Sequence, residues 1–426
     1  MPSDGDGSSR RLKSVDAVRA YQRAWLNETR DAAKGGKPFA ISHSDESEEI
    51  FTALNIPVLV INYWNFVIVS QNKAQHYDNL LEERGFVGPH FFGLGFASTL
   101  DPENAPWGGL PKPAVLMGSA RSEHELRIAE MWARELQCPF FPLDFNFSSS
   151  VKRIPPAKWW ERLRDDWESL VDPDRLNFRV EQNKALIRYL ETITGRTFSL
   201  LQLRALMERI NHQMDEWTAA LSLVAGAPVC PVTLRDQLAI YQMMWHRGSP
   251  VASDFIKAYR EEVEARVRSG ISAYGTTKYR LLYWSMLQEP PFHAFLQERY
   301  QAAFVASPYS SIPQFYARTV FDDDPLRALS ARNLFLFFLN SEWLVNEARR
   351  NRCDGVVAIE PPCSTPSANQ IACENADIPF IAVPGAKDDE TTRVALSRFM
   401  EERLTARRLE TSEGRPPGTA GRHDPA

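Results

Sequence analysis

Two short polar segments combine reactive side chains with positions where a strand is expected to end and a helix to begin. The first, Gly118–His124, carries Ser122 and His124, and the second, Glu360–Ser367, carries Cys363 among three prolines. The N-terminus of a helix presents free N–H groups and favours an anion or a thiolate. Both segments therefore suit an anionic ligand or a reactive thiol. They are also compatible with ordinary turns in which serines cap the helices.

Cys363 is the candidate for a reactive thiol, because the prolines around it hold the loop extended and outside a regular strand. The other cysteines lie in or beside apolar elements, where an unpaired cysteine usually serves as a small buried hydrophobe. They are Cys138, Cys230, Cys353 and Cys373. No Cys-x-x-Cys pair and no zinc-type pattern of Cys and His occurs, so no structural zinc site is expected.

Histidines and aromatic side chains offer further candidates. His90 lies in a segment rich in Gly and Phe, residues 88–95, and His124 stands close to the hydroxyl of Ser122. Either histidine can act as a general acid or base, although a lone histidine more often has a packing role. Aromatic residues make up 11% of the chain and are expected mostly to fill the core, with a pocket for an apolar or aromatic acyl group as the alternative.

The composition excludes several classes of protein. The chain has 426 residues, of which 44% are hydrophobic and 24% charged, as in folded globular proteins. The net charge of −5 offers no basic face for nucleic acid, and no run of about 18 apolar residues could span a membrane. Without a glycine-rich nucleotide fingerprint or a Walker A segment, ATP hydrolysis by this chain is not expected. Few cysteines and no apolar leader indicate a reducing cytoplasm.

The elements that position these residues alternate between strands and helices at both ends of the chain. Apolar strands are expected at 38–42, 56–61, 114–117 and 139–143, and again at 280–284, 303–306, 355–359 and 379–383. The pattern predicts an α/β protein with parallel sheets that flank a cleft. Its parts are an N-terminal tail and helix at 1–37, a first lobe at 38–150, a helical insert at 151–278, a second lobe at 279–408 and a disordered tail at 409–426.

Two helix starts are also expected in the N-terminal part of the chain. Ser14 is expected to cap the first helix, and Ser44 or Asp45 to cap a helix that contains Glu48 and Glu49. Such caps satisfy free N–H groups in the first helical turn.

Five segments, in this order and spacing, resemble the benzoyl-CoA reductase and 2-hydroxyacyl-CoA dehydratase family. They are GKPFAISHSDESEEIFTALNIPVLV, LPKPAVLMGSARSEHELRIAEMWARELQCPFFPLDF, AAFVASPYSS, CDGVVAIEPPCSTPSANQ and TTRVALSRFMEE. The resemblance runs from about Lys37 to Leu404. It is to the subunits that hold substrate and iron–sulfur clusters, not to the ATP-hydrolysing activator.

The resemblance implies two flavodoxin-like lobes with an acyl-CoA bound between them. In this family, cysteines of each subunit typically hold a [4Fe–4S] cluster, and a separate ATPase supplies one electron for a radical reaction on the thioester. The third family cysteine falls on Cys363, the second on Ser122, and the first near His90–Phe92, where no cysteine stands. A [4Fe–4S] cluster needs about four ligands, normally thiolates, so this chain is expected to lack the cluster or to hold it only with help.

The resemblance also implies a candidate site. The candidate catalytic residues are Cys363, Ser122 and His124, and the candidate ligand-binding residues are Ser307, Tyr309, Ser364, Gln370 and His90. The implied partners are an acyl-CoA thioester, a homologous subunit and an ATP-dependent activator. Neither nucleic acid nor a membrane is expected as a partner.

Three functions stay open on the sequence alone. One is a cluster-free subunit that pairs with a cluster-bearing homologue and forms part of an acyl-CoA pocket. Another is an enzyme that performs non-redox chemistry on an acyl-CoA with polar residues of the cleft. Such chemistry needs a titratable group within about 3 Å of the reacting atom and donors for an enolate oxygen. The third is a scaffold subunit without chemistry.

Overall fold

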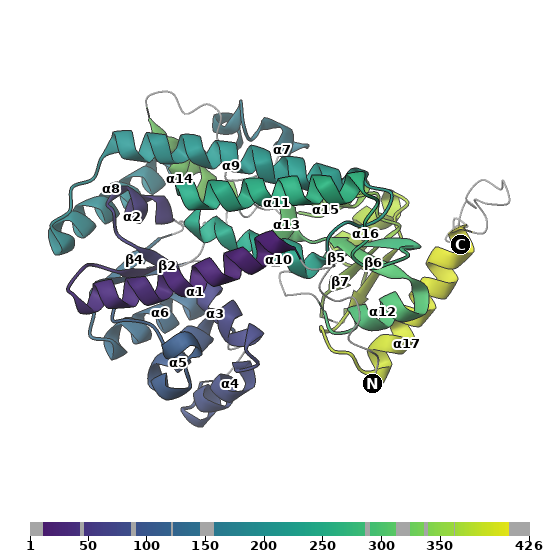
Figure 1. The fold of residues 1–426 in the computed structure, drawn as a ribbon, viewed down its shortest axis with the longest axis horizontal. Coiled ribbons are helices and arrows are strands. Elements are labelled where there is room, and N and C mark those ends of the chain that lie inside the picture. The colour runs from purple at the N-terminus through teal and green to yellow at the C-terminus, as the bar shows by residue number, and fades with distance from the viewer. Residues whose placement is uncertain are drawn as a thin grey trace, which may run out of the picture.

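Two four-stranded sheets form the framework of the protein (Figure 1). The strand order is β2-β1-β3-β4 in one sheet and β6-β5-β7-β8 in the other, and every neighbouring pair is parallel. Parallel neighbours need crossover connections, which helices supply. The computed structural model describes residues 12–42, 47–86, 91–120, 122–144, 157–285, 290–311, 324–335, 340–361 and 363–408.

The strands form from short apolar runs that are covered on both faces. Strands β1, β2, β3 and β6 are buried at every residue, as expected for parallel sheets between helices. The predicted α/β fold with two parallel sheets is confirmed. The strands are β1 (Ala40–Ser42), β2 (Val58–Val60), β3 (Val115–Ser119), β4 (Phe140–Leu143), β5 (Tyr279–Trp284), β6 (Ala302–Ala306), β7 (Gly355–Ile359) and β8 (Phe380–Val383).

Helices surround both sheets, and every regular element described between β4 and β5 is helical. Those of the N-terminal part are α1 (Lys13–Lys34), α2 (Glu48–Ala53), α3 (Ile61–Ser70), α4 (Ala74–Glu83), α5 (Leu94–Leu100) and α6 (Glu123–Glu135). The central ones are α7 (Trp159–Arg162), α8 (Pro173–Thr194), α9 (Leu200–Gly226), α10 (Leu234–Tyr241), the 3₁₀ helix η5 (Gln242–His246) and α11 (Pro250–Arg268). The C-terminal ones are α12 (His293–Tyr300), α13 (Pro308–Ser311), α14 (Pro325–Phe335), α15 (Ser341–Arg350), α16 (Ala368–Asn375) and α17 (Glu390–Arg398), which continues as a π-helix, Phe399–Thr405. Over the described residues, none of the helices combines the length and apolar character needed to cross a bilayer.

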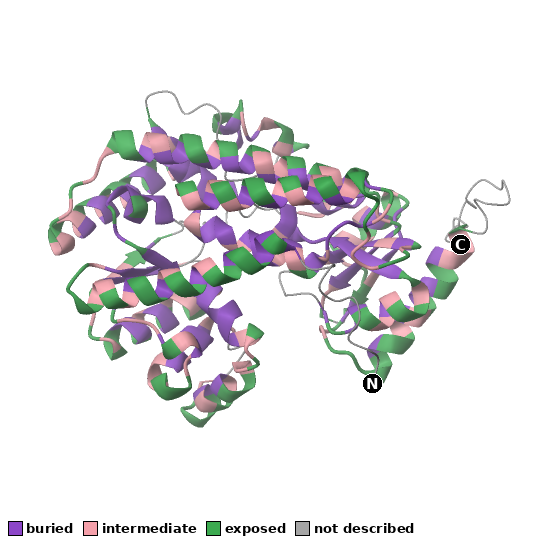
Figure 2. Ribbon diagram, viewed as in Figure 1, coloured by how far each residue is buried: buried purple, intermediate pink, exposed green. Residues whose placement is uncertain are grey.

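One apolar core runs through most of the molecule. It contains buried residues of α1, of the first sheet, of the central helices and of one face of the second sheet. A smaller core lies on the other face of the second sheet, against α12 and α17. Helices α9 and α11 lie side by side, and Figure 2 shows that the exposed residues of these long helices face outward. The central helices therefore hold the two sheets together.

The first helix begins at Lys13 and is capped by a residue far away in the sequence. The carboxylate of Glu262, in α11, accepts hydrogen bonds from the backbone N–H groups of Lys13 at 2.9 Å and Ser14 at 3.0 Å. It also accepts one from the Ser14 hydroxyl at 2.7 Å. The prediction that Ser14 is the N-cap was wrong, because a remote carboxylate satisfies the free N–H groups instead.

The start of the first sheet also differs from the sequence prediction. The apolar run 56–61 is a strand only over Val58–Val60, and Ile61 already begins α3. A wholly apolar run carries no alternation that would mark the change from strand to helix. The capping residues predicted for α2, Ser44 and Asp45, lie outside the described residues.

A cluster of buried charged side chains joins the start of α2 to the central helices and to α14. Glu48 and Glu49 are only 3% and 1% exposed. The Nε atom of Arg247 lies 2.6 Å from Glu49 Oε1, and its Nη2 atom lies 2.8 Å from Glu48 Oε2. Arg332 of α14 contacts both carboxylates. We call these four residues the buried charge cluster.

Neutral polar side chains extend this cluster into a hydrogen-bond network. Ser47 Oγ donates to Asn183 Oδ1 at 2.7 Å, and the amide of Asn183 donates to Ser330 Oγ at 2.8 Å. The amide of Asn333 donates to Ser47 Oγ at 3.2 Å. Because these residues belong to α2, α8 and α14, the network fixes three elements that are distant in the sequence.

Replacing Glu49 with Gln should destabilise the protein far more than the same substitution at Glu130, whose pair with Arg134 is exposed. Burial alone would raise the pKa of Glu49, but the guanidinium groups of Arg247 and Arg332 lower it to about 2. Breaking a buried pair typically costs about 3–5 kcal/mol, whereas an exposed pair contributes about 0–1 kcal/mol. The urea unfolding midpoints of E49Q and E130Q measure this difference.

The pH dependence follows from the direction of the shift. A carboxyl whose pKa is lowered in the folded state adds stability above its unfolded pKa, 4.5, and loses it as the pH falls toward about 2. The difference in urea unfolding midpoint between wild type and E49Q should therefore become smaller at pH values below 4.5. If E49Q and E130Q lose the same amount of stability at pH 7, the stabilising role of Glu49 is contradicted.

Candidate functional site

The carboxyl edges of both sheets carry the two polar segments selected from the sequence. Strand β3 ends at Ser119 and is followed by Ser122, and β7 ends at Ile359 and is followed by Cys363. Strand β3 pairs with β1, and β7 pairs with β5. β1 and β5 are the first strands of their sheets in the sequence, and the strand order reverses beside them. Open parallel sheets bind ligands outside this point.

Ser122 is the N-cap of α6. Its Oγ atom accepts a hydrogen bond from the backbone N–H of Glu125 at 3.1 Å, as in the alternative in which the serines of these segments cap helices. His124 is exposed in the first turn of the same helix. The N-terminus of α6 thus presents an imidazole beside N–H groups that lie before the first intrahelical hydrogen bonds.

Cys363 is exposed on the loop between β7 and α16. Its Sγ atom lies 3.5 Å from the hydroxyl of Thr365. This hydrogen bond, together with backbone N–H groups of the loop, lowers the pKa of the Cys363 thiol. Ser367 caps α16 by accepting from the N–H of Gln370 at 3.1 Å. The loop therefore presents an accessible thiol with increased thiolate character.

The other cysteines differ from Cys363 both in their exposure and in the pKa of their thiols. Cys230 and Cys373 are buried, and Cys138 and Cys353 are partly buried. Burial raises the pKa of all four thiols. Their predicted role as small hydrophobes agrees with this environment, and none of them is poised to act as a thiolate.

The candidates that follow β6 lie at the start of α13. Ser307 is 1% exposed, and its Oγ atom has no hydrogen-bond partner among the described residues. The ring of Tyr309 has its centroid 5.8 Å from that of Phe66 in α3 and 5.2 Å from that of Tyr241 in α10. Tyr309, which follows β6 of the second sheet, therefore contacts both α3 and α10.

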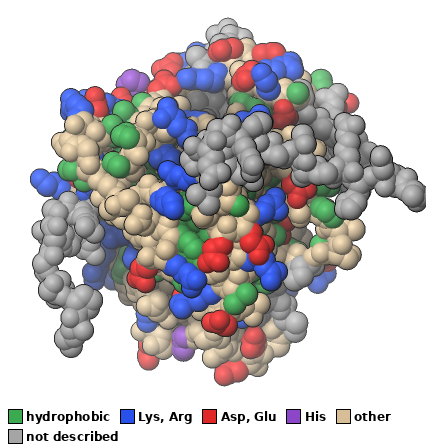
Figure 3. Space-filling model, turned by 90° about the vertical axis from the view of Figure 1, so that its right-hand side faces the viewer, with side chains coloured by type: hydrophobic (Ala, Val, Ile, Leu, Met, Phe, Trp, Pro, Cys, Tyr) green, Lys and Arg blue, Asp and Glu red, His purple; other side chains and the backbone are tan. Residues whose placement is uncertain are grey.

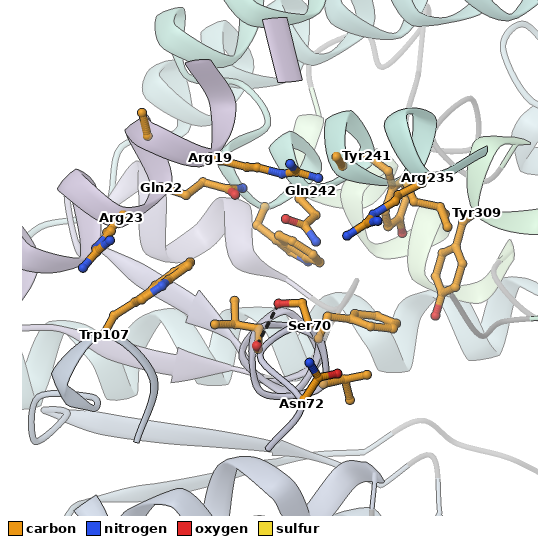
Figure 4. Close-up of a pocket in the computed structure, with 17 residues that line it drawn as sticks. Arg19, Gln22, Arg23, Ser70, Asn72, Trp107, Arg235, Tyr241, Gln242 and Tyr309 are labelled. Carbon is orange, nitrogen blue, oxygen red and sulfur yellow. Dashed lines mark hydrogen bonds between the residues drawn. The ribbon is translucent and has the colours of Figure 1, made fainter. Parts of the chain in front are cut away.

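A cavity of about 670 Å³ lies at this contact. Residues of α1, α3, α10 and η5 line it, and Tyr309 reaches it from α13 (Figure 4). Among the described residues, the lining includes no acidic side chain but three arginines and five aromatic side chains. They are Arg19, Arg23 and Arg235, and Phe66, Trp107, Tyr241, Trp245 and Tyr309. We call this the inter-helix cavity.

Gln22 of α1 also lines the inter-helix cavity. It is 1% exposed, and its Nε2 atom has no hydrogen-bond partner within the described part of the chain. A buried donor without an acceptor costs about 1–3 kcal/mol, which an acceptor in the cavity would recover. Sequence reasoning did not select this helix as part of a candidate site. The spacing of Arg19 and Arg23 could have drawn attention to it, because two residues four positions apart lie on the same face of a helix.

Side chains of both charges lie on the face of the protein that Figure 3 shows. On the face shown in Figure 3, Lys and Arg side chains are interspersed with Asp and Glu. This mixture agrees with the net charge of −5. The arginines of the inter-helix cavity therefore form a local basic site on a protein of negative net charge.

The structure thus distributes the predicted site residues over three strand ends. Ser364 is exposed beside Cys363, and Gln370, in α16, donates from its amide to Glu374 at 2.9 Å. Among the described candidates, Tyr309 alone lines the inter-helix cavity, and His90 lies outside the described residues. No group of three His, Cys, Asp or Glu side chains in the described ranges is arranged to hold a metal ion.

The amino-acid sequence of the chain is similar to those of known proteins. The chain is 22% identical over 289 residues to the (R)-phenyllactyl-CoA dehydratase alpha subunit of Clostridium sporogenes, covering 66% of this chain and 65% of the relative. The match therefore spans less than two thirds of that relative's length. Residues 47–402 match the family model described as 2-hydroxyglutaryl-CoA dehydratase, D-component, which leaves α1 outside. The resemblance found in the sequence is thus confirmed, and the chain belongs to the 2-hydroxyglutaryl-CoA dehydratase D-component family.

Proposed function

We propose that this chain is the acyl-CoA-binding subunit of a complex related to the 2-hydroxyacyl-CoA dehydratases and benzoyl-CoA reductases. It holds no iron–sulfur cluster of its own and pairs with a cluster-bearing homologue, which an ATP-dependent activator would reduce. The observation that carries the cluster-free assignment is Cys363, the sole exposed cysteine with a lowered thiol pKa. Family membership supports the acyl-CoA as ligand.

The side chains of this chain do not fit a resident [4Fe–4S] cluster. Such a cluster takes about four ligands, normally thiolates. Of the positions that the family would use, Cys363 supplies a thiolate, whereas the hydroxyl of Ser122 is engaged as a helix cap. The four remaining cysteines are buried or partly buried, and within the described ranges no three His, Cys, Asp or Glu side chains are grouped so that they could hold a metal ion.

The chain's own residues would bind and orient the thioester. N–H groups in the first turn of α6 would face the thioester carbonyl oxygen, where they stabilise developing negative charge. His124 would hold or accept a proton at the substrate, and the Cys363 thiol would border the reacting carbon from the loop after β7. The candidates Ser307, Tyr309, Ser364 and Gln370 would complete the walls of the ligand site.

An aromatic 2-hydroxyacyl-CoA is the substrate class that we favour. The relative from Clostridium sporogenes is named for (R)-phenyllactyl-CoA. The inter-helix cavity offers aromatic walls in Phe66, Tyr241 and Tyr309, against which an apolar or aromatic group can pack. Phenyllactyl-CoA is therefore the first thioester to test.

A second function is favoured by one observation, the accessible Cys363 with its lowered pKa. In that alternative the chain catalyses non-redox chemistry on an acyl-CoA with Cys363, Ser122 and His124, and needs no cluster in a partner. Turnover of an acyl-CoA by the isolated chain under air would favour this alternative over the first proposal.

Iron quantitation of the anaerobically purified chain tests the cluster-free assignment. With one thiolate at the family ligand positions, the chain should carry little or no iron and show no absorbance from thiolate-to-iron charge transfer. A content of about four iron atoms per chain, with that absorbance, would contradict the assignment.

The substitutions Cys363→Ala and Ser122→Ala should weaken the binding of phenyllactyl-CoA more than they weaken folding. Cys363 is exposed, so its loss should leave the melting temperature nearly unchanged. Loss of the Ser122 cap should cost about 0.5–2 kcal/mol of stability. Calorimetric titration of the thioester into each variant, beside its melting temperature, separates the two effects.

Ser199 provides a matched control for the Ser122 substitution. It caps α9 in the same way, accepting from the N–H of Gln202 at 3.3 Å, and it is likewise partly buried. Ser199→Ala should lose similar stability but keep full affinity for the thioester. If both serine variants keep the wild-type affinity, Ser122 is only a helix cap and its assignment to the site fails.

A further inference from the structure

Helix α1 carries polar groups toward the inter-helix cavity that packing does not explain. Arg19 and Arg23 lie four residues apart on one helix face, where like charges repel. Neither side chain forms an ion pair within the described residues. Burial raises the pKa of Asp236, and the positive charge of Arg19 offsets part of that rise. Their placement beside a cavity without an acidic lining residue favours an anionic ligand.

A third arginine of the cavity lining comes from another part of the chain. Arg235 lies in the first turn of α10, and Figure 4 shows Arg19 and Arg235 on the same side of the cavity, across from Ser70 and Asn72. Arg23 lies farther along, beside Trp107, and Tyr309 lies at the opposite end (Figure 4). Three guanidinium groups at the rim of an aromatic cavity match a ligand that joins phosphates to an apolar or planar body.

A buried donor gives independent evidence for a ligand. The Nε2 atom of Gln22 has no partner among the described residues although the side chain is 1% exposed and lines the cavity. Buried amides are nearly always hydrogen-bonded, so an acceptor is expected in the space that Gln22 borders. The cavity volume of about 670 Å³ lies within the range of small-molecule sites.

We infer that α1, which lies outside the residues that match the family, closes a binding site for the phosphorylated nucleotide portion of a coenzyme A thioester. This inference rests on the proposed function. The phosphates bind Arg19, Arg23 and Arg235, the base packs against Trp107 or Trp245, and Gln22 donates to an acceptor of the ligand. The thioester arm then runs toward Tyr309 and the carboxyl edge of β6.

Titration calorimetry of coenzyme A into the full-length chain tests this site. The double variant Arg19→Ala/Arg23→Ala should bind coenzyme A at least about tenfold more weakly, since charge-assisted hydrogen bonds to phosphate are lost. Its melting temperature should stay near that of wild type, because both side chains are exposed. Pantetheine, which has no phosphate, should bind wild type and the double variant equally.

Two further variants sharpen the test. The control Lys34→Ala/Lys37→Ala removes the same charge from exposed residues at and after the end of α1 and should leave the affinity unchanged. Gln22→Met keeps the volume of the side chain but removes its donor, and it should weaken coenzyme A binding while the protein stays folded. Arg235→Ala should weaken binding to a similar degree as a single α1 arginine variant.

The outcomes separate this inference from the proposed function. If the α1 arginine variant binds coenzyme A as tightly as the lysine control, while Cys363→Ala or Ser122→Ala still weakens thioester binding, the nucleotide site is wrong and the proposed function stands. If wild type binds neither coenzyme A nor its thioesters, both are overturned. Tenfold weaker binding of coenzyme A together with unchanged binding of pantetheine supports the site.

Discussion

The buried charge cluster is the constraint on which the arrangement of the molecule depends. Glu48 and Glu49 of α2 would be costly to bury alone, and the guanidinium groups of Arg247 and Arg332 offset that cost. An apolar core can accept small shifts, whereas separating these carboxylates from the guanidinium groups would leave buried charges unpaired. The cluster thereby ties the first lobe to the central helices and to α14.

That constraint extends to the candidate ligand site. Arg247 follows directly after η5, the segment that supplies Trp245 to the wall of the inter-helix cavity. Helix α1 covers the same cavity and is held at its N-terminus by Glu262 of α11. The walls of the cavity are therefore positioned by contacts of buried or capping carboxylates with distant segments: ion pairs at Glu48 and Glu49, and hydrogen bonds to the start of α1 at Glu262. A ligand would meet a largely preformed site.

Local patterns in the sequence predict the framework better than they predict the site. The strand at 355–359 is predicted to the residue, because an apolar β-branched run stands between turn residues. The burial of Glu48 and Glu49 could not be predicted, since acidic residues in a first helical turn normally face water and their cationic partners lie far along the chain. The exposed loop position of Cys363 could be predicted, because the prolines that shape the loop are its neighbours in the sequence. The inter-helix cavity was missed because α1, α3, α10 and α13 meet only in the folded protein.

The central claim is that this chain supplies an acyl-CoA site without a cluster of its own. A structure of the chain bound to a cluster-bearing homologue and to phenyllactyl-CoA, with anomalous scattering recorded at the iron edge, tests it most directly. The account predicts iron peaks in the partner alone and ligand density that runs from the arginines of α1 past Tyr309 to the strand ends at Cys363 and Ser122. An iron peak beside Cys363 within this chain, or ligand density elsewhere, would contradict it.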